Sequence, residues 1–450
     1  MSEILRDIQP PALESAQQQA SAVVSRALGP NARRKRVLIV GAGFAGIAAA
    51  RELRRCDAEV ILVDRRNHHI FQPLLYQAAT AVLAPSEIAA PIRQLAAKQK
   101  NLDVLLGNVS GVDMQTRSVD ASCPGIGVRK VPFDYLVIAT GMQPSYFGHD
   151  EFAKYAPGLK SLNDAETIRA RILSAYELAE QADHEQERMR QMTFVLVGGG
   201  PTGVELAASI AHLAAVTLRG QFRRIDPARS EIVLVEGGTR ILPAFAESLS
   251  RKAARRLATL GVKILTGAKV DKIDADGVVA NGTRIACATV LWTAGVSASP
   301  LLKQLGAMTD RVGRISVGPF MNVPDIPDVF VVGDASSVVR DGRPVPGVAQ
   351  AAIQQGRYVG RLIARELGGA QSKRPFQYFD KGNMAVVGKN FAILERGHLR
   401  MSGFVTWLVW CVLHVMSLPQ PQNKWRVRIQ WLLSYFTGQR SSRLIPERTP

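Results

Sequence analysis

Residues 37–46 read Val-Leu-Ile-Val-Gly-Ala-Gly-Phe-Ala-Gly, and this stretch decides the fold. Its four apolar residues predict a buried strand, its glycines a tight turn, and the alanine-rich residues 47–55 a helix. A second strand is predicted at 59–63 and ends at Asp64, 18 residues beyond Gly46. A G-x-G-x-x-G motif between strand and helix, with an acidic residue at the next strand end, is typical of a dinucleotide-binding fold.

The glycines and the acidic residue have separate roles in such a site. Gly41 permits the tight turn, Gly43 lets the backbone approach a pyrophosphate, and Gly46 lets the helix pack closely on the strand. The helix N-terminus offers unpaired N–H groups to the phosphates. Asp64 can accept hydrogen bonds from ribose hydroxyls. The alternative is that these glycines only form a turn.

The same arrangement returns in the middle of the chain. A predicted strand at 194–197 runs into Gly198-Gly199-Gly200-Pro201-Thr202-Gly203 and a helix over 204–218. The next strand, 231–235, ends at Glu236, which follows Gly203 by 33 residues because an inserted basic loop is predicted at 219–230. Two fingerprints in one chain indicate two dinucleotides, one held permanently and one exchanging.

Three further strands end in small residues and complete the expected topology. They cover residues 134–141, 288–295 and 329–334. We expect an α/β fold with two Rossmann-like dinucleotide-binding domains, the NAD domain inserted in the FAD domain, followed by a C-terminal amphipathic, membrane-associating helical region. The expected limits are 1–35 for a flexible N-terminal extension, 36–150 and 296–375 for the FAD-binding domain, 151–295 for the NADH-binding domain, and 376–450 for the C-terminal membrane-anchoring region, to which the family resemblance given below adds the quinone site.

Composition narrows the class of protein. The 450 residues carry 56 Lys and Arg against 38 Asp and Glu, a formal charge of +18, which indicates an anionic partner surface such as lipid or nucleic acid. The four cysteines have neither a C-x-x-C motif nor metal-ligand spacing, so we expect no disulfide framework, metal site or redox dithiol. The N-terminal residues lack the apolar core of an export signal.

The sequence resembles the two-dinucleotide-binding flavoprotein superfamily and, more closely, the type II NADH:quinone oxidoreductases, over roughly residues 36–445. Beyond the fingerprints, the resemblance rests on residues 64–77 (DRRNHHIFQPLLYQ), 349–354 (AQAAIQ) and 380–385 (DKGNMA). It implies that hydride passes from NADH to a tightly but non-covalently bound FAD, and that two electrons then pass to a membrane quinone without proton pumping.

The resemblance also implies residue roles. FAD would be held by Gly41, Gly43, Phe44, Gly46, Asp64, Arg65, Thr140, Gly141, Gly333 and Asp334, and NADH by Gly198, Gly200, Gly203, Glu236 and Gly295. Gln350, Gln354 and Lys381 would belong to the quinone site, and Glu205 would lie near the flavin and nicotinamide. The alternatives are that Glu205 only complements its helix N-terminus and that Lys381 is an exposed turn lysine.

Glu236 bears on the choice of nucleotide. A carboxylate at this strand end binds the 2′-hydroxyl of NADH and repels the 2′-phosphate of NADPH. Arg240, four residues later, weakens this argument slightly. We therefore expect NADH as the substrate, and we expect His68 and His69 to serve in turn packing rather than catalysis.

The C-terminal region carries two candidate interfacial helices. Residues 403–418 are apolar but too short to span a bilayer. In the next segment an apolar stripe is flanked by Lys424, Arg426 and Arg428, with Arg440 and Arg443 extending a basic rim. We expect Trp407, Trp410, Trp425 and Trp431 at the level of the lipid headgroups. Alternatively, these helices pack on a dimer partner.

Together these features predict a monotopic enzyme, peripheral on the cytoplasmic face of the cell or inner membrane, with a membrane quinone and the bilayer surface as partners. A homodimer is expected and nucleic acid is not. One alternative is a sulfide:quinone oxidoreductase, which needs cysteines flanking the flavin; none lies in residues 333–354. The other is a flavin-bearing redox sensor that uses its basic surface without turnover.

Overall fold

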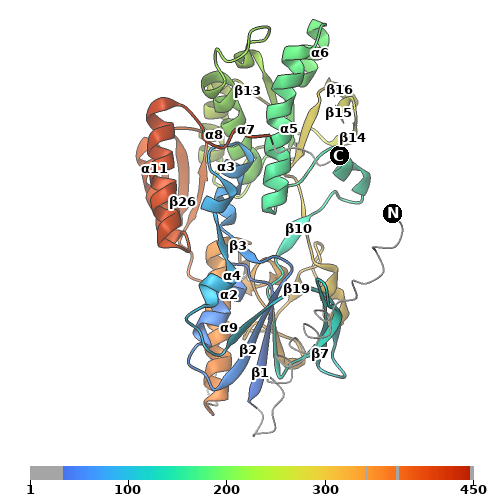
Figure 1. Cartoon of the computed structure of the whole chain (residues 1–450), viewed down its shortest axis with the longest axis vertical. Helices are drawn as coiled ribbons and strands as arrows, with labels where there is room; N and C mark the ends of the chain where they lie inside the picture. The colour runs from blue at the N-terminus through green and yellow to red at the C-terminus, as the bar shows by residue number, and fades with distance from the viewer. Residues whose placement is uncertain (1–33, 341, 371–373, 446–450) are drawn as a thin grey trace, which may run out of the picture. The chain divides into compact units, whose positions relative to one another are not determined.

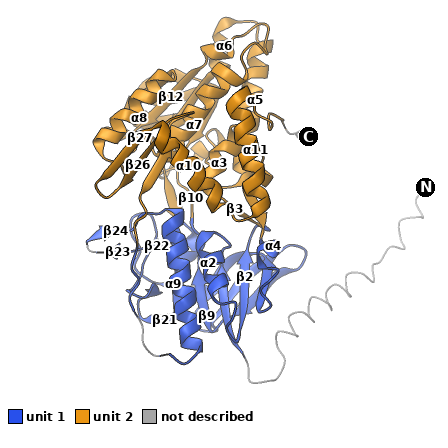
Figure 2. Ribbon diagram, turned by 90° about the vertical axis from the view of Figure 1, so that its left-hand side faces the viewer, with its two compact units in different colours: residues 1–67, 92–141, 298–378 blue, residues 68–91, 142–297, 379–450 orange. Residues whose placement is uncertain are grey.

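The computed structural model describes residues 34–340, 342–370 and 374–445 (Figure 1). Within these ranges the chain divides into two compact units. Unit 1 comprises residues up to 67, 92–141 and 298–378, and unit 2 comprises 68–91, 142–297 and 379 onward (Figure 2). Almost all of the expected N-terminal extension, residues 1–35, lies outside the described part of the chain.

Unit 1 is built on a six-stranded sheet. Its strand order is β20 (Asn322–Val323), β21 (Ile326–Val331), β9 (Tyr135–Ile138), β1 (Lys35–Val40), β2 (Ala58–Asp64) and β5 (Leu102–Leu106). All neighbours are parallel except β20 and β21. Residues 37–40 of β1 are buried, as their uninterrupted apolar run predicts for a central parallel strand.

Two helices of unit 1 pack tightly on each other. They are α2 (Phe44–Glu52), directly after the first glycine turn, and α9 (Ala349–Leu367). A Cβ on Gly356 of α9 would lie 2.1 Å from the Ala45 carbonyl oxygen, and one on Gly360 would lie 2.6 Å from that of Ala49. The two glycines therefore let α9 lie directly against the backbone of α2.

Smaller elements complete unit 1. These are α4 (Ile92–Ala96), the antiparallel sheet β6 (Asn108–Asp113), β7 (Ser118–Cys123) and β8 (Gly127–Pro132), and the pairs β19 (Ile315–Ser316) with β22 (Ser336–Ser337) and β23 (Val339–Arg340) with β24 (Arg343–Pro344).

Unit 2 repeats the strand, glycine turn and helix pattern on a second parallel sheet. The strand order is β13 (Val262–Thr266), β12 (Glu231–Glu236), β11 (Thr193–Val197) and β17 (Thr289–Trp292). Its helices are α5 (Leu162–Gln181), α6 (Glu185–Gln191), α7 (Pro201–His212) and α8 (Glu247–Thr259), and a π-helical turn, Leu213–Thr217, continues α7. Minor strands are β10 (Met142–Pro144) with β18 (Val296–Ala298), and β14 (Val270–Asp274), β15 (Gly277–Ala280) and β16 (Thr283–Ala286).

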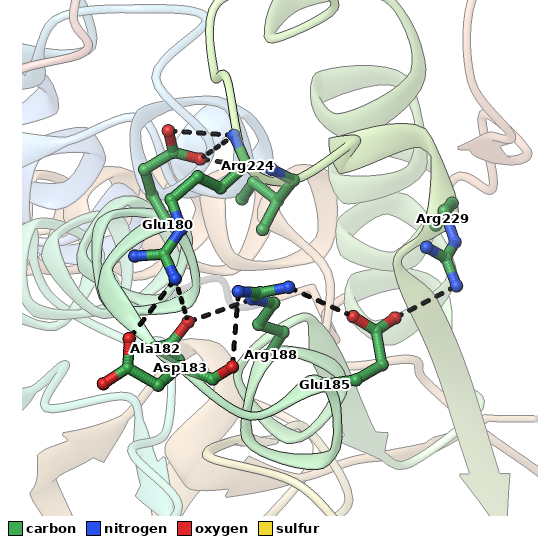
Figure 3. A network of polar contacts seen from close by, with 8 residues as sticks. Glu180, Ala182, Asp183, Glu185, Arg188, Arg224 and Arg229 are labelled. Atoms are coloured by element: carbon green, nitrogen blue, oxygen red, sulfur yellow. Dashed lines mark hydrogen bonds and ion pairs between the residues drawn. The ribbon is translucent and has the colours of Figure 1, made fainter.

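The basic insertion between α7 and β12 is fastened to the end of α5 (Figure 3). The Glu180 carboxylate accepts hydrogen bonds from the backbone N–H groups of Arg223, Arg224 and Ile225. The Arg224 guanidinium also pairs with Asp183 at 3.3 Å. The insertion that lengthens the second fingerprint is therefore held by side-chain contacts.

Unit 2 also includes two segments that are distant in sequence. One carries β3 (His68–Ile70), α3 (Leu75–Ala79) and β4 (Ala89–Pro91), and the other carries β25 (Asn383–Val386), β26 (Ala392–Arg396), β27 (Leu399–Gly403), α10 (Phe404–Ser417) and α11 (Pro421–Thr437). The sequence-based limits placed residues 68–91 with the FAD-binding part. They belong to unit 2 because α3 is buried at every residue and packs against α5 and α7. His69 is buried within β3.

Candidate functional site

The first glycine turn in unit 1 has the geometry of a dinucleotide site. Gly41 has φ +104° and its Cβ position lies 2.4 Å from the Ala139 carbonyl oxygen, so only glycine fits. A Cβ on Gly46 would lie 1.8 Å from the carbonyl oxygen of Gly41, which explains the close approach of α2. At Gly43 the nearest atom to a Cβ position is 4.0 Å away, which leaves room beside the turn for another group.

Polar groups surround this turn. Asp64 accepts hydrogen bonds from the backbone N–H of Ala42 at 2.7 Å and of Arg66 at 2.8 Å, so its carboxylate holds the turn in place. The hydroxyl of Thr140, at the end of β9, is buried and has no hydrogen-bond partner among the described residues. A buried hydroxyl without a partner is uncommon and suits a group that binds there. Arg65 is exposed.

A second turn of unit 1 follows β21. Gly333 has φ +72°, and its N–H donates to the Gln355 side-chain oxygen at 2.6 Å. The buried Gln355 was not singled out from the sequence, although it adjoins Gln354. Gln350 and Gln354 lie one turn apart in the N-terminal half of α9 and are half-buried, as is Asp334.

The second glycine turn in unit 2 matches the first. Gly198 has φ +110°, a Cβ on Gly203 would lie 2.0 Å from the Gly198 carbonyl oxygen, and the space beside Gly200 is open. Gly295, after β17, leaves no room for a Cβ, which would meet Phe147 at 2.6 Å.

Glu236 binds its own glycine loop in the way that Asp64 does. Its carboxylate accepts hydrogen bonds from the N–H groups of Gly199 and Gly238, both at 2.6 Å. Arg240 donates to the backbone carbonyls of Phe245 and Pro243, at 2.7 and 2.9 Å. Arg240 is therefore engaged within its loop, which weakens the case for a 2′-phosphate site there.

An apolar cavity of about 550 Å³ lies within unit 2. Its lining comes mainly from α3, α7, α10 and α11. The lining side chains of α10 and α11 include exposed ones, such as Leu408 and Leu432, whereas Tyr76, Ser209 and Arg440 on the lining are buried. The cavity thus combines accessible apolar side chains with buried polar ones, and its volume is typical of small-molecule sites.

Glu205, on the first turns of α7, faces this cavity. Its side chain keeps some exposure on the cavity side, while the surrounding protein desolvates the carboxyl. This burial raises the pKa of Glu205 to about 8, although the Val386 N–H, which donates at 3.3 Å, lowers it. Glu205 therefore carries a proton at neutral pH.

A chain of hydrogen bonds borders the cavity. The indole N–H of Trp431 donates to the Gln77 side-chain oxygen at 2.7 Å, and the Gln77 amide donates to the Tyr76 hydroxyl at 3.0 Å. Trp431 stacks on Trp410, which is 2% exposed, at 5.5 Å between ring centroids. Burial raises the pKa of Tyr76 well above its ordinary value, so the phenol is neutral.

These contacts locate two of the tryptophans and correct one expectation for the C-terminal region. Trp410 and Trp431 lie in the cavity wall, where each packs against aromatic or polar groups of unit 2. Arg440 is not part of an exposed basic rim, since it is 4% exposed and donates to backbone carbonyls. The sequence shows no apolar periodicity around Arg440 that would indicate its burial.

The structure brings some of the predicted site residues together at the cavity and places others away from it. Within unit 2, Glu205 joins Tyr76, Gln77 and Arg440 at the cavity, whereas Lys381 is exposed and does not line it. Gln350 and Gln354 belong to unit 1.

The apolar stripe predicted on α11 is exposed. Its members Trp425, Ile429, Leu432, Leu433 and Phe436 are all exposed, as are Val405, Leu408 and Val412 of α10. Within the described ranges, no helix combines the length and the apolar character that crossing a bilayer requires. The two helices therefore present an unusually apolar surface.

The cysteines are free thiols in varied surroundings. Cys123 and Cys287 are buried, and Cys56 and Cys411 are half-buried. Burial raises the pKa of both Cys287 and Cys411 to about 12. These two thiols are therefore protonated and poorly nucleophilic.

Comparisons with known proteins show the family and the fold of the chain. Residues 35–356 match the pyridine nucleotide-disulphide oxidoreductase family. The type II NADH:quinone oxidoreductase Ndh of Mycobacterium tuberculosis is 43% identical over 427 residues, which are 92% of this chain and 91% of that protein. NdhA, another type II NADH:quinone oxidoreductase of the same organism, is 41% identical over 89% of this chain and 87% of its own length.

Among solved structures, that of NDH2 from Plasmodium falciparum in complex with NADH superposes with a TM-score of 0.82 at 17% identity, covering 92% of this chain and all of that one. At this identity the likeness concerns the fold alone. The comparisons confirm the α/β class and the family resemblance expected from the sequence.

Proposed function

Because the chain belongs to the type II NADH:quinone oxidoreductases, we propose that it oxidises NADH and passes the electrons to a membrane quinone without pumping protons. The main support for this function is the 43% identity, over 92% of the chain, to a type II NADH:quinone oxidoreductase. The two glycine turns, one in each unit, support the proposal of separate sites for the flavin and the nicotinamide nucleotide.

Unit 1 is proposed to hold FAD, which accepts hydride and releases electrons singly or in pairs. The open space at Gly43 and the partnerless Thr140 hydroxyl suit its pyrophosphate and ribose. The proposed FAD-binding residues are Gly41, Gly43, Phe44, Gly46, Asp64, Arg65, Thr140, Gly141, Gly333 and Asp334.

Unit 2 is proposed to hold NADH at Gly198, Gly200, Gly203, Glu236 and Gly295. The open side of Gly200 lies at the N-terminus of α7, whose free N–H groups favour a phosphate. The charge of Glu236, with Arg240 engaged elsewhere, favours a ribose hydroxyl over a 2′-phosphate.

The unit 2 cavity is proposed to receive the quinone. Its apolar walls match an isoprenoid tail, and Glu205 can supply a proton to a reduced quinone because it is protonated at neutral pH. The family resemblance adds Gln350, Gln354 and Lys381 to the quinone site as proposals.

The exposed faces of α10 and α11 are proposed to lie in the interface of the bilayer, as a monotopic foot on the cytoplasmic side. Lys424, Arg426 and Arg428 lie beside the apolar stripe and suit anionic headgroups. A homodimer that covers part of this surface is also proposed.

Anaerobic rapid mixing of the purified holoprotein with NADH tests the function. The flavin absorbance should bleach with NADH and return when a long-chain quinone is added, and Gln350→Ala with Gln354→Ala should slow only the return. Bleaching by sulfide instead of NADH would favour a sulfide:quinone oxidoreductase. Bleaching by NADH without reoxidation by quinone, together with salt-dependent DNA binding, would favour a redox sensor.

A further inference from the structure

One of the buried side chains that line the unit 2 cavity is the guanidinium group of Arg440. Arg440 donates from Nη1 to the Thr80 carbonyl at 2.6 Å and from Nη2 to the Ser209 carbonyl at 2.9 Å. Its Nη2 also lies 3.2 Å from Nδ1 of His212. Thr80 is the C-cap residue of α3, and Ser209 lies in α7 shortly before the π-helical turn that continues it, so the cation meets backbone carbonyl groups of two helical segments.

Arg440 has no acidic partner among the described residues. Its polar contacts are with two neutral carbonyls and an imidazole. Burial and the coulombic effect of Arg440 lower the pKa of His212 to about 4, so this imidazole is neutral at pH 7. A buried charge is costly when no opposite charge offsets it, and carbonyl dipoles offset it only in part.

The other groups that line the cavity leave its charge positive. Glu205 is protonated at neutral pH, as derived above. The Lys389 ammonium lies 4.0 Å from the Tyr435 ring centroid and donates to the Tyr435 carbonyl, and Arg428 also lies on the lining. The Tyr76 hydroxyl accepts from Gln77 and has no acceptor for its own proton among the described residues. The buried polar part of the lining therefore offers donors and positive charge.

A neutral quinone fits the apolar walls but leaves the charge of Arg440 unmatched. A molecule with an alkyl chain and a terminal carboxylate satisfies both the apolar and the polar part of the lining. We propose that the cavity also binds a long-chain carboxylate, a free fatty acid taken from the bilayer, with its carboxylate on Arg440 and Tyr76 and its chain between α10 and α11. Because it would occupy the proposed quinone cavity, the fatty acid competes with quinone; this consequence rests on the proposed function.

Fluorescence of the intact holoprotein in detergent tests the carboxylate site, because Trp407, Trp410 and Trp431 line the cavity. Dodecanoate and its methyl ester are titrated in parallel, since they share the alkyl chain and differ in charge. We expect the wild type to bind dodecanoate at least about tenfold more tightly than the ester, as a charge-assisted hydrogen bond would give. Equal affinities for acid and ester would overturn the proposal.

Variants at Arg440 and Arg443 test whether the preference for dodecanoate over its ester comes from the Arg440 guanidinium. Arg440→Gln should make the two affinities equal, and Arg440→Lys should keep part of the preference. Arg443→Gln is the matched control, because Arg443 donates to the Arg440 carbonyl and to Gln221 and does not line the cavity. A preference that survives Arg440→Gln, or disappears equally in Arg443→Gln, would contradict the site.

Tyr76→Phe and pH cover the case in which Arg440→Gln does not fold. Tyr76→Phe removes the hydroxyl donor without changing charge and should weaken dodecanoate binding more than ester binding. The wild-type preference should fall between about pH 7 and 9, because burial places the pKa of Glu205 at about 8 and its ionised carboxylate would repel that of dodecanoate in the same cavity. His212, Lys389, Tyr76, Tyr176 and Arg443 are the other titratable groups around the guanidinium. A preference that is constant over this range would refute the assignment.

Kinetics separates this inference from the proposed function. If quinone uses the same cavity, dodecanoate raises the quinone KM at unchanged kcat and leaves flavin reduction by NADH unaffected. If dodecanoate binds through Arg440 by fluorescence but leaves the quinone KM unchanged, the carboxylate site stands and the quinone belongs elsewhere.

Discussion

At the scale of single residues, Asp64 and Glu236 each hold the glycine loop of their own unit in place. Each carboxylate ends the second strand of its sheet and accepts N–H groups from its glycine loop. The sequence indicated that both would contact a ribose, and it gave no sign that both also hold the loop. If these carboxylates also bind ribose as proposed, nucleotide binding and loop geometry are coupled in one side chain.

The first prediction separates these two roles at Glu236. Glu236→Gln keeps an oxygen acceptor for the Gly199 N–H but loses the charge that repels a 2′-phosphate. We expect the ratio of kcat/KM for NADH over NADPH to fall about tenfold, while Glu236→Ala also raises the KM for NADH. Glu231→Gln, at the exposed start of the same strand, is the control. An unchanged ratio in Glu236→Gln would show that this carboxylate does not select the nucleotide.

The second prediction concerns the pH dependence of stability through Glu205. The folded protein keeps this proton up to about pH 8, whereas the unfolded chain releases it near 4.5, so unfolding between these values releases a proton. Stability should therefore be lost as pH rises through this window, by up to about 1.4 kcal/mol per pH unit. Urea unfolding of wild type and Glu205→Gln at several pH values measures the difference. Parallel pH profiles for the two proteins would contradict the burial of the carboxyl.

At the scale of elements, the sequence predicted the strands, turns and helices that are set by residues close together in the chain. The turns at 41–46 and 198–203 occur at the predicted positions, because the backbone there leaves room only for glycine at the crowded positions. The faces of α10 and α11 were harder to assign, since both sides are rich in apolar and aromatic residues. Only the tertiary contacts distinguish buried Trp410 from exposed Trp425.

The third prediction tests the contact between α2 and α9. Gly356→Ala would bring a methyl group to 2.1 Å from the Ala45 carbonyl oxygen, so the helices must separate. We expect a loss of about 1 to 3 kcal/mol in stability and weaker retention of FAD on gel filtration. Gly368→Ala is the control, because its nearest atoms are 3.5 Å away. Equal melting temperatures for the two variants would refute the close packing.

The fourth prediction tests the foot. Ile429→Asp with Leu433→Asp changes two α11 side chains that are both 55% exposed and do not line the cavity. The double variant should keep its melting temperature but bind anionic vesicles at least about tenfold more weakly. Met308→Asp, at a residue that is 80% exposed in unit 1, should bind as the wild type does. Unchanged vesicle binding by the double variant would show that the apolar stripe of α11 does not bind the membrane, and would favour a protein partner on this surface.

At the scale of the whole molecule, the sequence predicted two domains, each with a glycine turn, but not which chain segments make up the two compact units. Residues 68–91 join unit 2 because α3 packs against α5 and α7, which begin more than eighty residues further along the chain. Such long-range packing leaves no local pattern. The burial of Arg440 against Thr80 and Ser209 could not be predicted from the sequence for the same reason.

The fifth prediction is that the C-terminal region cannot be removed cleanly. Deletion from residue 400 takes the buried Trp410, Val415, Leu418, Val427 and Arg440 from unit 2. We expect the truncated chain to aggregate, whereas the double α11 variant stays soluble. Centrifugation followed by FAD quantification compares them. A soluble truncated chain that still binds NADH would show that unit 2 folds without this region.

The division of unit 2 into three chain segments has a consequence for biosynthesis. Every segment of unit 1 has been translated by residue 378, whereas unit 2 still lacks residues 379 onward at that moment. The parallel sheet of unit 1 can therefore form on the ribosome while the nascent cavity between α3 and α7 is still open. The α3 and α7 side chains that line this cavity stay uncovered until translation has passed α10, α11 and Arg440, and during this interval a chaperone or the membrane surface can cover them.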